Sequence, residues 1–168
     1  GEPFAQADSL IELLQALKIA GYNTAVETSG CASPENLLRA AEFCDLFLYD
    51  LKVGENSREY VGADFGKLIS GLSVLDEAGA NVRLRCPIIP GVNDNRRHIE
   101  LIAGTADSHS SVKSVELEPY HPLGLRKYKN IGSEAAYHCD RKLCQETLAE
   151  LLNELQGLTK KNAFYDAE

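Results

Sequence analysis

The stretch Asp45-Leu-Phe-Leu-Tyr-Asp-Leu-Lys52 is the segment that best indicates the fold of this chain of 168 residues. Residues 45–49 form a short apolar run with aromatic side chains, which is typical of a strand buried on both faces. Asp50 and Lys52 are two apart and therefore point the same way where the strand ends. Because parallel α/β folds bind ligands at the carboxyl ends of strands, this pair marks a candidate site. The alternative is a surface ion pair in the turn.

Helical and extended patterns alternate along the rest of the chain. Hydrophobic spacing, caps and glycine stops predict helices at 8–20, 34–43, 68–78, up to about 106, and 140–156, and strands at 23–28, 45–49, 81–89, 112–119 and 161–165. We expect Ser9 and Glu12 to form a capping box, and Asn93 or Asp94 to cap the helix that reaches about Ala106. Such alternation indicates parallel strands joined by right-handed crossovers.

Charged residues alternate with apolar ones near the carboxyl end of each of the first predicted strands. These residues are Glu27, Asp50 with Lys52, Arg83 with Arg85, and Glu116 with Glu118. Helices can cover the apolar faces, whereas the charged faces must meet one another, because isolated buried charges are too costly. The pattern predicts a barrel or partial barrel with a nearly balanced polar interior that holds a polar ligand. The competing interpretation is that Arg83 and Glu116 merely pair at an exposed sheet edge.

The positions of the histidines and of the first cysteine indicate whether their side chains could face the cavity. His121 follows a strand end and could face the cavity, although a structural hydrogen bond is the other interpretation. We expect His98, His109 and His138 to be ordinary surface residues. Cys31 lies just past a strand end and could also face the cavity.

Composition narrows the class of protein. The net charge of −8 and the scattered lysines and arginines argue against a nucleic-acid surface. No apolar run reaches 18 residues and no signal segment opens the chain, so we expect no membrane span and a cytoplasmic location. The five cysteines show no metal-finger spacing and fit a reducing compartment. The length predicts a single domain over residues 1–168.

Short motifs in a fixed order resemble one enzyme family. They are Gly1-Glu2-Pro3, Val26-Glu-Thr-Ser-Gly30, Tyr49-Asp-Leu-Lys52, Arg85-Cys-Pro-Ile-Ile-Pro-Gly-Val-Asn-Asp94 and Leu117-Glu-Pro-Tyr-His121-Pro-Leu-Gly124. Together they resemble the glycyl-radical-enzyme activating enzymes of the radical S-adenosylmethionine superfamily, such as those that act on pyruvate formate-lyase. The resemblance extends over nearly the whole chain.

The resemblance implies a partial (β/α)6 barrel that binds a [4Fe–4S] cluster and S-adenosylmethionine. The resemblance further implies that reductive cleavage of S-adenosylmethionine gives a 5′-deoxyadenosyl radical, which takes a hydrogen from a glycine of the partner glycyl radical enzyme. The resemblance also implies an electron donor such as flavodoxin or ferredoxin. The matching motifs imply roles for individual residues. Gly1 and Glu2 would hold the methionine amino group, Glu27 would lie near the methionine moiety, and Arg85 would approach the methionine carboxylate. Asp50 and Lys52 would contact the ribose or the methionine end, and His121 would lie on the adenosine side.

One departure from the family is large. The family binds its cluster with Cys-x3-Cys-x2-Cys, and none of the five cysteines has that spacing. The chain starts at Gly1 and contains no methionine. We therefore expect a longer reading frame with another glycine directly before Gly1 and the cysteine motif upstream, and we expect this chain alone to be inactive. A barrel without its first strands should self-associate through the edge at residues 23–28.

Two other functions remain open from the sequence. Lys52 at a barrel strand end could form a Schiff base in an aldolase, with Asp50 or Glu27 as the acid–base partner. The chain could instead be a non-catalytic module that docks a partner protein.

Overall fold

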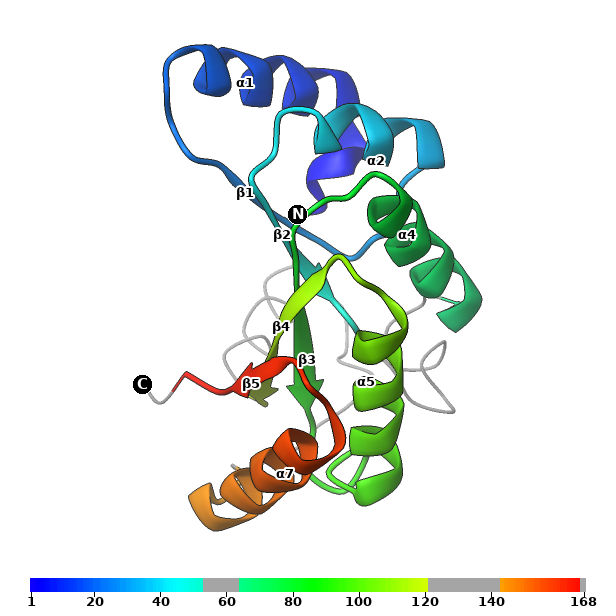
Figure 1. Cartoon of the computed structure of the whole chain (residues 1–168), viewed down its shortest axis with the longest axis vertical. Coiled ribbons are helices and arrows are strands. Elements are labelled where there is room, and N and C mark those ends of the chain that lie inside the picture. The colour runs from blue at the N-terminus through cyan, green and yellow to red at the C-terminus, as the bar shows by residue number, and fades with distance from the viewer. Residues whose placement is uncertain (53–63, 121–142, 167–168) are drawn as a thin grey trace, which may run out of the picture.

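The computed structural model describes residues 1–52, 64–120 and 143–166 (Figure 1). Within these residues, a short 3-10 helix, η1, precedes five strands that alternate with five α-helices. The elements are η1 (Pro3–Gln6), α1 (Ala7–Ile19), β1 (Ala25–Thr28), α2 (Pro34–Ala41), β2 (Leu46–Asp50), α4 (Phe65–Glu77), β3 (Val82–Ile88), α5 (Arg96–Ser108), β4 (Val112–Pro119), α7 (Gln145–Leu158) and β5 (Asn162–Phe164). The predicted alternation of strands and helices is confirmed.

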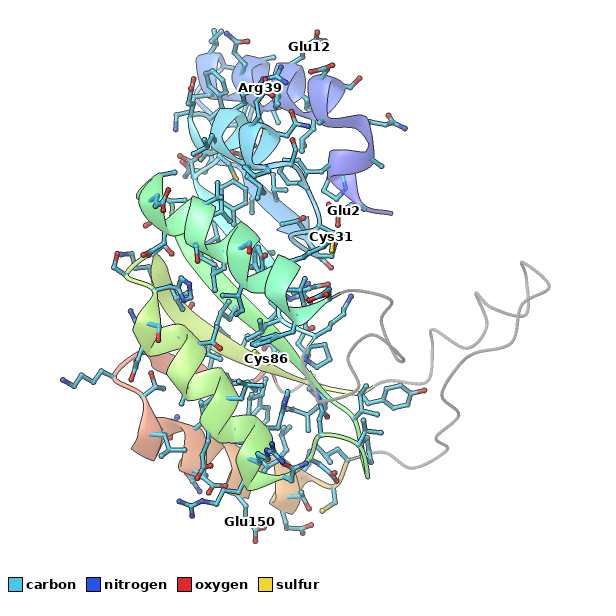
Figure 2. All side chains as sticks on the ribbon, turned by 90° about the vertical axis from the view of Figure 1, so that its right-hand side faces the viewer. Glu2, Glu12, Cys31, Arg39, Cys86 and Glu150 are labelled. Carbon is cyan, nitrogen blue, oxygen red and sulfur yellow. The ribbon has the colours of Figure 1, made fainter. Side chains whose placement is uncertain are left out.

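The strands form one parallel sheet whose order in space follows the chain, β1-β2-β3-β4-β5. Helices α4 and α5 lie to one side of the sheet in Figure 1 and in front of it in Figure 2, which is turned toward that side. A parallel sheet with crossover helices on one face is the architecture of a barrel wall. The prediction of a partial barrel is therefore confirmed.

The core lies between the helices and one face of the sheet. Burial alternates strictly along β3, where Val82, Leu84, Cys86 and Ile88 are fully buried and the residues between them are partly exposed. The same two-residue period appears on β1, on β2 and on β4 from Val115 onward. Since successive side chains of a strand point to opposite faces, each strand gives one face to the core and the other to the predicted charged surface.

The predicted N-terminal caps of two helices are wrong. Helix α1 begins at Ala7, directly after η1, so Ser9 lies inside the helix and forms no capping box. Helix α5 is capped by Asn95, whose side chain accepts a hydrogen bond from the His98 amide. Asn93 and Asp94 instead bond within the preceding loop, to the amides of Ile89 and Gly91. A capping pattern in the sequence cannot distinguish between neighbouring Asn and Asp residues when loop contacts compete for them.

Two histidines expected at the surface are buried. His98 is 4% exposed and His109 is 8% exposed. His109 Nδ1 lies 2.8 Å from the Thr105 carbonyl, and its Nε2 lies 3.3 Å from Ser73 Oγ. Both imidazoles therefore pack between elements. His138 lies outside the described residues.

Of the helices in the described part of the chain, none combines the length and the apolar character that crossing a membrane requires.

Candidate functional site

The acid and base at the carboxyl end of β2 meet as predicted. Lys52 Nζ lies 2.9 Å from Asp50 Oδ2, and the Asp50 side chain is only 13% exposed. Asp50 is in register with Arg85 on β3, and Arg85 is in register with Glu116 on β4. The parallel register therefore gathers charges from three neighbouring strands at one end of the sheet.

Arg85 is the centre of this charged face. Its NH1 lies 2.9 Å from Glu27 Oε1 of β1 and 3.9 Å from Asp50 Oδ1 of β2. Its Nε lies 4.0 Å from Glu116 Oε2, and its NH2 contacts Glu118. One guanidinium, 21% exposed, thus joins carboxylates of three strands. A planar guanidinium with five donors suits such multiple contacts better than an ammonium does.

Arg83 supports the same face closer to the middle of the sheet. Its NH1 lies 3.6 Å from Glu116 Oε2, and its guanidinium lies 5.1 Å from the centre of the Phe164 ring on β5. The predicted pairing of Arg83 with Glu116 is therefore present, but within a larger network rather than as an isolated pair. Arg83 Nε is buried and has no hydrogen-bond partner among the described residues.

The charged face carries a small excess of negative charge. Three cationic side chains, Lys52, Arg83 and Arg85, oppose four carboxylates, those of Glu27, Asp50, Glu116 and Glu118, which leaves a formal charge of −1. Burial raises the pKa of Glu118 despite the contact with Arg85, and the nearby Asp50 and Glu116 add to the rise. Burial alone would lower the pKa of Arg85, but the surrounding carboxylates raise it above its ordinary value. The face therefore favours a ligand that adds positive charge.

Asp50 also has one oxygen atom, Oδ1, whose ion-pair contact with Arg85 NH1 at 3.9 Å is too long for a hydrogen bond. Its Oδ1 is buried and accepts no hydrogen bond in the part of the chain that the structure describes. A buried carboxylate oxygen without a donor is costly, and a bound hydroxyl or ammonium group would satisfy it.

The first residues of the chain lie against the turn that follows β1. Gly1 is exposed, whereas Glu2 is half-buried and accepts a hydrogen bond of 2.9 Å from the Ser29 amide (Figure 2). Cys31, two residues further on, is an exposed free thiol. The structure thus brings the Gly1-Glu2 segment to the end of β1, the strand that carries Glu27.

Two contacts in this region were missed by sequence reasoning. The fully buried Tyr49 donates its hydroxyl hydrogen to the Leu68 carbonyl at 2.6 Å, which ties β2 to α4. Asn93 accepts from the Ile89 amide at 2.6 Å and donates to the Pro87 carbonyl at 2.8 Å, which clamps the loop after β3. The only sequence signal for the first contact is Gly71 in the middle of a helix, where glycine needs a reason.

One predicted site residue cannot be located. His121 lies outside the described residues. Across residues 1–52, 64–120 and 143–166, no group of three or more His, Cys, Asp or Glu side chains could hold a metal ion.

The comparisons with known proteins agree on one family, although no family model matches the chain. The chain is 39% identical over 140 residues to the choline trimethylamine-lyase activating enzyme of Oleidesulfovibrio alaskensis, which covers 80% of this chain and 45% of the relative. It is 30% identical over 168 residues to the pyruvate formate-lyase-activating enzyme of Clostridium pasteurianum, which covers 90% of this chain and 67% of the relative.

A solved structure shows the same fold. It is a domain of a pyruvate-formate lyase-activating enzyme from Bacteroides vulgatus, which superposes with a TM-score of 0.80 at 22% identity and covers 99% of this chain and 95% of that one. Together with the sequence relatives, this places the chain among the glycyl-radical-enzyme activating enzymes of the radical S-adenosylmethionine superfamily. The predicted family is confirmed. The chain spans about half the length of several curated relatives that it matches, 45% for each of three.

Proposed function

We propose that this chain forms the S-adenosylmethionine-binding wall of an activase that generates a glycyl radical on a partner enzyme such as pyruvate formate-lyase. The observation that carries the proposal is the Arg85 network, which joins charges of β1, β2 and β4 at the end of the sheet where parallel folds bind ligands. Membership in the activating-enzyme family supports it.

The charges of this face suit S-adenosylmethionine. The ligand carries an ammonium, a carboxylate and a sulfonium, with a net charge of +1, and therefore needs acids and bases together. Asp50 offers a buried acceptor for a ribose hydroxyl or the ammonium, and Lys52 and Arg85 offer donors for the carboxylate. Glu27 lies beside Arg85, near the proposed methionine end. We place His121 on the adenosine side.

The described residues do not fit an iron–sulfur cluster, because they include no group of side chains that could hold a metal ion. We propose that the cluster ligands belong to another part of the enzyme, and that this chain binds and orients S-adenosylmethionine. In the complete enzyme the cluster would supply the electron, taken from a donor such as flavodoxin or ferredoxin, that cleaves S-adenosylmethionine to the 5′-deoxyadenosyl radical needed to remove a hydrogen from a glycine of the partner. Arg85 and its carboxylates hold the ligand in one orientation and exclude water from its charged end.

The test is the affinity of the complete protein for S-adenosylmethionine after Lys52→Ala. Loss of one charge-assisted hydrogen bond should weaken binding by about 1–3 kcal/mol, measured by isothermal titration calorimetry. Lys113→Ala is the matched control, because Lys113 is exposed near the start of β4 and donates to the Ser110 carbonyl. Equal affinities of the Lys52 and Lys113 variants would refute the proposed site.

A second experiment on the complete protein distinguishes the proposed function from the alternative of a Schiff-base aldolase. Lys52 is already ion-paired to Asp50, and the family relatives are activating enzymes rather than aldolases. Borohydride in the presence of carbonyl compounds should therefore leave Lys52 unmodified, as judged by peptide mass spectrometry.

A further inference from the structure

Donors within the chain occupy the acceptor sites of the Glu2 carboxylate. Its Oε1 accepts from Thr28 Oγ1 at 2.8 Å and from the Phe4 amide at 3.3 Å. Its Oε2 accepts from the Ser29 amide at 2.9 Å and from Ser29 Oγ at 2.6 Å. A carboxylate has about four lone-pair sites, and four donors already occupy them. Little acceptor capacity is left for the ammonium of a ligand.

The turn that Glu2 holds is fixed from its other side as well. Gly30 has a positive φ of 73°, and a Cβ on it would overlap the hydroxyl group of Tyr49. Its amide donates to Thr28 Oγ1 at 3.0 Å. On helix α4, a Cβ at Gly71 would come within 2.8 Å of the Gly30 carbonyl oxygen. The turn at 28–30 is therefore confined between Glu2 on one side and Tyr49 with α4 on the other.

The confined turn directly follows the residue that β1 gives to the charged face. Glu27 lies one residue before Thr28, and its carboxylate lies 2.9 Å from Arg85 NH1. A shift of the turn would therefore move the end of β1, including Glu27, relative to Arg85. Because electrostatic contacts depend steeply on geometry in a partly buried site, such a shift would weaken ligand binding without removing any ligand contact.

We propose that the side chain of Glu2 is a positioning group, which fixes the turn at 28–30 and the end of β1 for ligand binding, and that its carboxylate does not contact the methionine ammonium. This inference rests on the proposed function, and it replaces the role that the family resemblance implied for the Glu2 side chain. Burial would raise the pKa of Glu2, but the hydrogen bonds from Ser29, Thr28 and Phe4 lower it, so the anion is the form that these donors hold.

The test compares two ligands in the complete protein. S-adenosylmethionine carries the methionine ammonium, whereas its desamino analogue lacks only that group and keeps the carboxylate and the sulfonium. Glu2→Gln should weaken the binding of both ligands by the same factor, about tenfold, because the variant loses the charge-assisted bonds to the turn. Glu12→Gln, an equal charge change at an exposed position of α1 (Figure 2), should leave both dissociation constants unchanged.

A milder variant tests whether Glu2 acts through the turn. Ser29→Ala removes one of the four donors to Glu2. The double variant should bind both ligands about as weakly as Glu2→Gln alone, since the two residues share one contact. Faster amide hydrogen exchange at Ser29 in Glu2→Gln should report the loosened turn without any ligand.

The outcomes separate the inference from the proposed function. Weakened binding of S-adenosylmethionine alone would mean that Glu2 contacts the ammonium, and would overturn the inference while leaving the function intact. A lower unfolding temperature with unchanged dissociation constants would mean a purely structural role and would overturn it as well. Wild-type protein that binds neither ligand would overturn the proposed function together with this inference.

Discussion

Acidification should destabilise the protein through His98. This imidazole is buried, and burial lowers its pKa from 6.5 to about 4. Its Nε2 lies 3.1 Å from Asn93 Nδ2, and that amide nitrogen must be a donor because Asn93 Oδ1 accepts from the Ile89 amide. The neutral imidazole therefore accepts this hydrogen bond. A protonated imidazole would turn a second donor toward Asn93 and would break the clamp on the loop after β3.

The sign and size of the effect follow from proton linkage. Between pH 6.5 and about pH 4 the unfolded chain binds more protons at His98 than the folded protein does, so acidification favours unfolding. The contribution of neutral His98 is fully present above pH 6.5 and is lost as the pH falls toward about 4. At about 1.4 kcal/mol per pKa unit, the loss amounts to about 3 kcal/mol in total.

The assay is urea unfolding of wild-type protein and of His98→Gln, followed by circular dichroism. Glutamine is a good helix former, its Oε1 can accept from Asn93, and it does not titrate. The two proteins share all other titrating groups, so the difference between their free energies of unfolding isolates His98. As the pH falls from about 7.5 to about 4.5, the free energy of unfolding of the wild type should decrease by about 2–3 kcal/mol relative to that of His98→Gln. A difference that stays constant over this range would refute the reasoning.

Other predictions test the packing, the edge and the chemistry of the chain. Gly71→Ala should lower the free energy of unfolding by about 1–3 kcal/mol in a urea titration, because the added Cβ would come within 2.7 Å of Tyr49 Oη. Gly104→Ala on α5 is the control and should be neutral or stabilising, because its Cβ would meet nothing within 4 Å among the described residues. The β1 edge should pair between chains at high concentration, and a strictly monomeric light-scattering mass would contradict this. The isolated chain should stay colourless after anaerobic reconstitution with iron and sulfide and should release no 5′-deoxyadenosine, so a brown protein with stoichiometric iron would show that this account of the chain is wrong.

The sheet and its charged face could be predicted because a period of two is visible in the sequence. In β3, Arg83 and Arg85 alternate with Val82, Leu84 and Cys86, and the structure places the two sets on opposite faces. The partners of Arg85 were less predictable. Its contacts with Glu27 and Glu118 depend on the register of separate strands, which the sequence of any one strand does not contain.

The burial of His98 had a signal that the prediction overlooked. His98 precedes Ile102 by four residues and therefore shares the inward face of α5. A histidine in a mostly polar first turn resembles a surface residue unless this spacing is weighed. Gly71 was itself a signal, as a glycine in the middle of a helix, but the sequence did not show its reason, which is a tyrosine on a strand that lies far away in the sequence. Contacts of this kind follow from tertiary packing and not from local pattern.

The order of the strands has a consequence for how the protein is made. Each strand pairs with the one synthesised before it, so the sheet can grow by one strand and one helix at a time as the chain leaves the ribosome. Arg85 lies on β3, but Glu116 and Glu118 lie on β4 and emerge later. Until β4 docks, the guanidinium has only the carboxylates of earlier strands. A nascent chain therefore completes the charged face around Arg85 only after most of the sheet already exists.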